Sequence, residues 1–96
     1  MPAPLRRLVL DILKPIKGIS IIDVGREIAA IKGVDGVNIT VKEIDVETVT
    51  LSMTIEGEDI DFEKVRERLE EFGCIIHSID QVIAGKRIVE EPRLEE

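Results

Sequence analysis

Hydrophobic and polar positions along the chain follow two periods, one typical of strands and one of amphipathic helices. Apolar and polar residues alternate over 36–44 and 48–56, which predicts the two strands of a hairpin. A mostly apolar run at 5–13 predicts a central strand that is buried on much of both faces, and the β-branched run at 74–84 predicts a further strand. Over 20–32 and 61–72 the apolar residues recur three and four positions apart, which predicts two helices that begin at Ser20 and Asp61.

The order of these elements is β-α-β-β-α-β, in one domain over residues 1–96. Right-handed crossovers then give an antiparallel sheet with strand order 4-1-3-2, numbered along the chain, and place both helices on one face. This is an α+β ferredoxin-like sandwich. From about residue 90 the tail is expected to be mobile.

The alternation also predicts which side chains face the helices. In the first strand we expect Leu8, Leu10 and Ile12 to face them, and Arg7, Val9 and Asp11 to face the open side. In the last strand two apolar sets compete, and we favour the odd-numbered set toward the helices: Ile75, His77, Ile79, Gln81 and Ile83.

Composition narrows the function classes. Asp and Glu number 20 against 13 Lys and Arg, and a net charge of −7 would repel a phosphate backbone, so we expect no nucleic-acid partner. No window approaches 18 consecutive apolar residues, so no membrane span is predicted. The single Cys74 excludes an internal disulfide, which favours a reducing, cytoplasmic location. Such dense mixed charge is also typical of thermophile proteins.

Three segments carry a resemblance to a known family: LVLDILKP at 8–15, GVNITV at 36–41 and IHSIDQVIAGK at 76–86. Together they resemble the domain of unknown function numbered 211, a small family of uncharacterised archaeal proteins, over nearly the whole chain. The resemblance implies a ferredoxin-like fold and a homo-oligomeric, ring-like assembly. It implies no established activity and no catalytic residues.

The residues that carry the familiar activities of this fold are absent from this sequence. An RNA-recognition domain needs aromatic residues on its central strands, and the chain has only Phe62 and Phe72, both in the second predicted helix. A heavy-metal-binding domain needs paired thiols after the first strand, where this chain has Lys14 to Gly18. The phosphate loop of an acylphosphatase is also missing. The sequence therefore favours a non-enzymatic protein.

Asp11 is the first candidate site residue, because a carboxylate in an apolar central strand needs a partner that offsets its desolvation. The last strand lies beside the first in the predicted sheet, so Ser78 and Asp80 can approach Asp11. Together these oxygens predict a divalent-cation site for calcium or magnesium. The alternative is a salt bridge from Asp11 to Arg7, Lys42 or a lysine of a neighbouring subunit.

Basic residues at the two ends of the sheet are the second set of candidates, for a small anionic ligand. Lys14 and Lys17 precede a helix N-terminus, and Lys86 follows the last strand at the opposite end. His77 is the only histidine, a residue type that changes charge near neutral pH. The alternatives are solvated lysines, a structural His77 and a Cys74 that only packs.

These features predict a homo-oligomeric small-ligand-binding or regulatory module, similar in plan to amino-acid-sensing ferredoxin-like domains that bind effectors between subunits. Apolar residues on both faces of 74–84, and Ile88 and Val89 beyond Gly85, would be wet in a monomer. We expect the segment after Gly85 to reach a neighbour, as a strand added to its sheet edge. The alternatives are a metal-dependent enzyme that uses Asp11, Asp80 and His77, and a purely structural oligomer.

Overall fold

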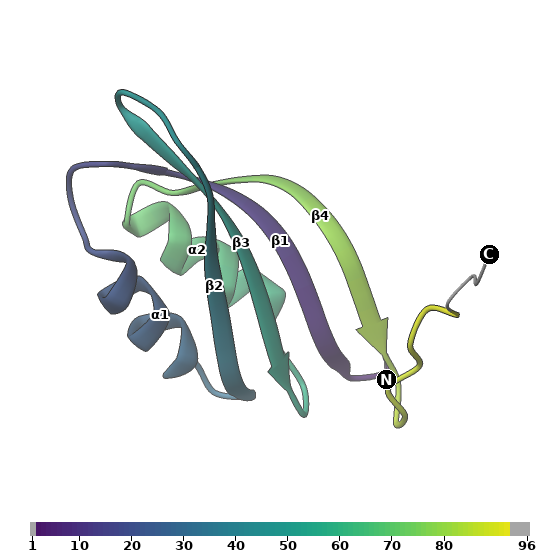
Figure 1. Ribbon diagram of the computed structural model, residues 1–96. Coiled ribbons are helices and arrows are strands. Elements are labelled where there is room, and N and C mark those ends of the chain that lie inside the picture. Colours follow the sequence, from purple (N-terminus) through teal and green to yellow (C-terminus); the bar gives the residue numbers. More distant parts are fainter. Residues whose placement is uncertain (1, 93–96) are drawn as a thin grey trace.

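A computed structural model of the protein describes residues 2–92 and confirms the predicted order of elements (Figure 1). The elements are β1 (Leu5–Pro15), α1 (Ile21–Ala29), β2 (Val34–Ile44), β3 (Thr48–Gly57), α2 (Phe62–Glu71) and β4 (Ile75–Ala84). Residues 93–96, which belong to the tail expected to be mobile, lie outside the described residues. No helix within residues 2–92 is long and apolar enough to cross a membrane.

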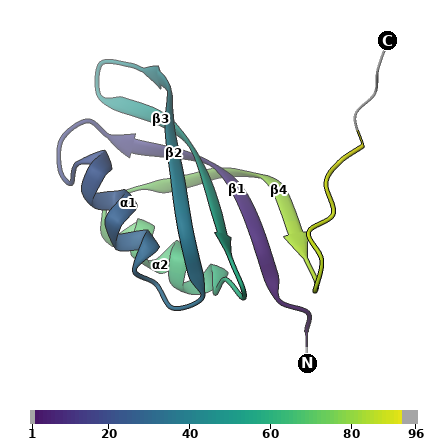
Figure 2. The same ribbon diagram turned by 60° about the horizontal axis from the view of Figure 1, so that its bottom comes forward.

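The four strands form one antiparallel sheet in the order β2-β3-β1-β4, which is the predicted 4-1-3-2 order read from the other edge. Both helices cover the same face of this sheet, as Figures 1 and 2 show. The result is a flat two-layer molecule of 39 × 39 × 18 Å. The ferredoxin-like α+β fold is confirmed.

The core lies between the sheet and the helices, where the predicted apolar stripes meet. Val24 and Ile28 of α1 and Val65 and Leu69 of α2 are fully buried against alternate residues of the two central strands. The strand residues of this core are Leu8, Leu10, Ile12, Val49, Leu51, Met53 and Ile55.

Both helices begin at the predicted capping residues. The hydroxyl of Ser20 accepts a hydrogen bond from the Asp23 N–H at 3.1 Å, and the carboxylate of Asp61 accepts one from the Lys64 N–H at 3.2 Å. Helix α1 ends at Ala29, three residues before the predicted end, because the chain turns tightly through Ile31 toward Gly33, which has a φ of 94°.

Strand β1 continues two residues past its predicted end at 13. The alternation of buried residues therefore extends from Leu8, Leu10 and Ile12 to Lys14, which is only 3% exposed. This buried lysine lies on the helix side of the sheet. The chain leaves the sheet only after Pro15.

The predicted face assignment of β4 is wrong. Cross-strand pairs of an antiparallel sheet share a face, and β1 pairs Leu8 with Val82, Leu10 with Ile79 and Ile12 with Ile76 on the helix side. Of the odd-numbered residues that we expected on the helix side, these pairings place only Ile79 there. The β1–β4 register shifts three times, at Arg6 of β1 and at His77 and Asp80 of β4, and the two shifts in β4 space its residues on this face by three instead of two.

The helix layer does not extend over the whole sheet. The C-terminal part of β4 lies away from both helices in Figures 1 and 2. Ile79 and Val82 face the helix side there, yet they are 51% and 54% exposed. Strand β4 therefore forms an apolar, uncovered edge of the sheet.

Candidate functional site

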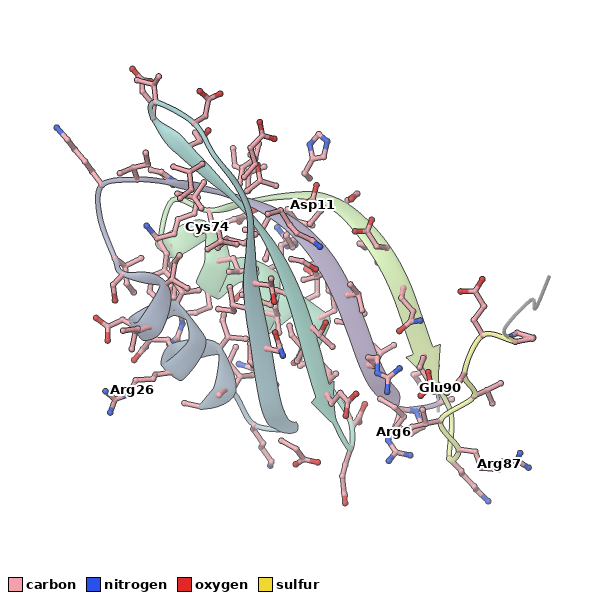
Figure 3. The ribbon with its side chains drawn as sticks, viewed as in Figure 1. Arg6, Asp11, Arg26, Cys74, Arg87 and Glu90 are labelled. Carbon is pink, nitrogen blue, oxygen red and sulfur yellow. The ribbon has the colours of Figure 1, made fainter. Side chains whose placement is uncertain are left out.

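A row of oxygen-bearing side chains crosses the open face of the sheet. Register pairs Thr40 of β2 with Ser52 of β3, Ser52 with Asp11 of β1, and Asp11 with Ser78 of β4. Asp11 is half-buried and lies on the face opposite the helices, as predicted (Figure 3). The open face is thus a flat polar surface with a carboxylate near its centre.

Two of the three predicted cation ligands, Ser78 and Asp80, contact each other. Ser78 stands opposite Asp11, and its hydroxyl donates a hydrogen bond to the Asp80 carboxylate at 2.7 Å. Within residues 2–92 no group of three His, Cys, Asp or Glu side chains is placed to hold a metal ion. Any site here would therefore depend on two carboxylates and the hydroxyls between them.

The alternative salt-bridge partners of Asp11 within the subunit are Arg7 and Lys42. Among the described residues Asp11 pairs with neither of them, and Arg7 pairs with other carboxylates. The Arg7 guanidinium lies 2.6 Å from the Glu56 carboxylate and 2.8 Å from that of Glu90. The hydrogen bonds that Arg7 donates to these two carboxylates raise the pKa of Arg7.

The four predicted anion-binding residues do not form one site within the subunit. Lys14 is buried, and its ammonium donates a hydrogen bond to the Pro15 carbonyl at 2.7 Å, so it does not join Lys17 at the surface. Lys17 and His77 are exposed. Lys86 is exposed and lies at the other end of the sheet. It follows Gly85, whose N–H donates a hydrogen bond to the Pro4 carbonyl just before β1.

Two consecutive arginines hold the segment that follows β4. Arg6 donates hydrogen bonds to the carbonyls of Gly57 at 3.1 Å and Lys86 at 2.6 Å. The Arg7–Glu90 salt bridge fastens the same segment four residues later. The chain from Gly85 to Glu90 is therefore attached to the sheet.

Cys74 lies between α2 and β4 and is 2% exposed. Burial raises the pKa of its thiol, while the positive charge of Lys14 acts in the opposite direction. A buried thiol with a raised pKa is a poor nucleophile, which agrees with the packing role considered from the sequence.

The sequence prediction missed two surfaces that the structure makes prominent. One is the tip of the β2–β3 hairpin, where Ile44 and Val46 are 70% and 88% exposed. The other is the attachment of the C-terminal segment by Arg6 and Arg7. The tip carried a usable signal, since the apolar residues in Glu43-Ile44-Asp45-Val46-Glu47 occur in a turn that no core can cover.

Comparison with known proteins places the chain among archaeal relatives of unknown function. The family model DUF211, described as uncharacterised ArCR, matches residues 6–96. An uncharacterised protein of Methanocaldococcus jannaschii, MJ0319, is 51% identical over 89 residues, which cover 93% of this chain and 91% of the relative. With a match over nearly its entire length and a relative at this level of identity, the chain belongs to the DUF211 family.

Proposed function

We propose that this protein is a cytoplasmic, non-enzymatic module that assembles into a homo-oligomer and binds a small ligand in a regulatory role. The observation that carries the proposal is the uncovered edge formed by β4. Ile75, Ile79 and Val82 are all more than half exposed along this one strand. Large apolar side chains exposed together along one strand are typical of an interaction surface.

Both faces of β4 contribute to this edge. Register places Ile79 and Val82 on the helix side of the sheet, and Ile75 on the open side opposite Leu13. Ile88 and Val89 of the attached C-terminal segment, 41% and 67% exposed, extend the apolar surface beyond the strand. A second copy of the chain that covers this edge would bury all five residues.

Light scattering on a size-exclusion column tests the assembly. We expect a mass that is a multiple of 10.7 kDa at micromolar concentration. Ile79→Asp with Val82→Asp should shift the protein toward the monomer, because it places charges in the buried part of the contact. Ile22→Asp is the matched control, since Ile22 is 73% exposed on α1, away from β4. A monomeric wild-type protein would overturn the proposal.

The second part of the proposal is that the small ligand binds at subunit boundaries, next to Lys17, His77 and Lys86. Lys17 lies beside Val46 and Glu47 in a pocket of about 320 Å³ that Pro15 and Ile16 complete. Lys86 and His77 belong to the β4 side of the molecule. Calorimetric titration with inorganic phosphate tests this part. We expect heat of binding that Lys17→Ala and Lys86→Ala each reduce, and no heat from wild-type protein would remove a phosphate-like ligand.

Cation binding is the second candidate function, and one observation favours it. The Ser78 hydroxyl donates a hydrogen bond to the Asp80 carboxylate, and Ser78 is the register partner of Asp11, so oxygen-bearing side chains of β1 and β4 lie at neighbouring positions. Calorimetric titration of metal-stripped protein with calcium and with magnesium tests it. Binding that Asp11→Asn abolishes while the fold persists would support this candidate, and no heat with either ion would exclude it.

A further inference from the structure

We infer that the acidic tip of the β2–β3 hairpin docks onto the basic turn after β4 of the next copy, head to tail. The inference rests on the proposed homo-oligomer and names the surfaces that make its contact. The hairpin tip is residues 43–47, Glu-Ile-Asp-Val-Glu, and the basic turn is residues 86–89, Lys-Arg-Ile-Val. Each surface pairs two exposed apolar side chains with charges of one sign.

The hairpin tip is an ordered turn that projects its side chains outward. The Asp45 N–H donates to the Thr48 carbonyl at 2.8 Å, and the Asp45 carboxylate accepts from the Val46 N–H at 2.8 Å. The Glu47 carbonyl accepts from the Ile16 N–H at 3.0 Å, which ties the tip to the loop after β1. An ordered turn with Val46 88% exposed loses little conformational entropy when it docks.

The basic turn is equally well held. Gly85, with a φ of 112°, starts the turn and donates its N–H to the Pro4 carbonyl at 2.8 Å. Arg6 holds the Lys86 carbonyl, and the Arg7–Glu90 salt bridge closes the far side. The side chains of Lys86 and Arg87 remain exposed, and Figure 3 shows Arg87 extending away from the sheet.

The charges of the two surfaces are complementary, and no described residue pairs with them. Among residues 2–92 the carboxylates of Glu43, Asp45 and Glu47 form no salt bridge, and neither do Lys86 and Arg87. Opposite charges around apolar side chains favour contact and fix its orientation.

The two surfaces cannot meet within one chain. The hairpin tip lies beyond the Pro15 end of β1, and the basic turn lies beyond its Leu5 end. The 11 residues of β1 span about 30 Å. Figures 1 and 2 show the hairpin tip and the C-terminal segment at opposite ends of the molecule.

A second copy is the occupant that this arrangement fits. Each chain carries both halves of one complementary pair at opposite ends, so every copy can offer its hairpin tip to one neighbour and its basic turn to another. Such heterologous contacts build rings when the rotation between copies closes. The basic turn also continues directly from β4, so this contact and the uncovered β4 edge lie on the same side of the subunit.

Charge reversal in two separate variants tests the contact. One variant is Glu43→Lys with Glu47→Lys, which leaves the Asp45 turn intact, and the other is Lys86→Glu with Arg87→Glu. Each variant alone should raise the dissociation constant of the oligomer at least about 100-fold, because like charges then face each other. Combining all four reversals in one chain should restore assembly, since each hairpin tip again meets a turn of opposite charge.

Circular dichroism checks that each variant is folded, and Lys64→Glu with Glu67→Lys on the exposed side of α2 is the matched control. A wild-type oligomer that resists both reversals would overturn this contact and leave the proposed assembly standing. Loss of assembly without rescue in the combined variant would also overturn it, since that variant tests the pairing of the two surfaces. A monomeric wild-type protein would overturn the proposed function itself.

Discussion

Gly57 at the end of β3 lies against the carbonyl oxygen of Gly33, so closely that a Cβ on Gly57 would overlap this oxygen. The contact joins the turn after α1 to the end of the β3 strand. The register of β2 and β3 begins beside it, where Val34 pairs with Gly57. The smallest side chain is therefore required at this corner of the fold.

Gly57→Ala should lower the free energy of unfolding by about 2 kcal/mol or more, because backbone must move to accommodate the methyl group. Thermal or denaturant unfolding measures the change. Gly36→Ala is the control, since a Cβ at Gly36 meets nothing within 4 Å and its φ lies outside the left-handed region. Equal stability of the two variants would contradict the close approach.

Lys14→Met should stabilise the protein or leave its stability unchanged. Lys14 is 3% exposed, and the one hydrogen bond its ammonium donates to protein, to Pro15, only partly offsets the desolvation of a charge. Met keeps the length of the side chain without the charge. Chemical denaturation measures the change in the free energy of unfolding. A loss of several kcal/mol would contradict the prediction and show that the Lys14 ammonium makes a stronger stabilising contact.

The thiol of Cys74 should react slowly with a thiol reagent in the folded protein and quickly after unfolding. Burial hides the sulfur, and the raised pKa reduces the thiolate fraction near pH 8. The matched control is Ile75→Cys combined with Cys74→Ala, because Ile75 is 63% exposed at the next position. Equal rates for the two cysteines would contradict the burial of Cys74.

Glu90→Gln should release the C-terminal segment from the sheet, seen as faster amide hydrogen exchange over residues 86–92 at pH 7. The charge-assisted hydrogen bond from Arg7 holds the pKa of Glu90 below its ordinary value. The attachment is therefore present above the ordinary glutamate pKa of about 4.3 and is lost as the pH falls through the lowered folded-state pKa. Glu91→Gln, at the adjacent exposed position, should leave exchange unchanged.

Most of the fold was predictable because its core is periodic. The stripe of Val65 and Leu69 and the alternation through Leu51 and Met53 each describe one face of a regular element. The central β1–β3 pairing runs without a register break, so a strict period of two described it correctly. Lys14 was misplaced only because the strand was expected to end at 13; the same alternation, continued to Pro15, places it in the core.

The faces of β4 were not predictable in this way. Its alternation is interrupted at His77 and at Asp80, and the residue types around these positions resemble those of a regular strand. The candidate cation ligands depend on the same strand, since the shift at His77 follows directly on the pairing of Ser78 with Asp11. The hairpin tip escaped prediction for a different reason. Ile44 and Val46 lie at the turn between two alternating strands, outside the core pattern on which the prediction was based.

The interruptions of β4 have a counterpart at the other edge of the sheet. Strand β2 also shifts its register twice against β3, near Asp35 and near Lys42, whereas the central pair is regular. Irregular outer strands are a poor template for further strands, which protects a protein against open-ended, fibre-like aggregation. The exposed isoleucines and valines of this chain therefore lie on edges that favour side-chain contacts of limited number over unlimited growth of the sheet.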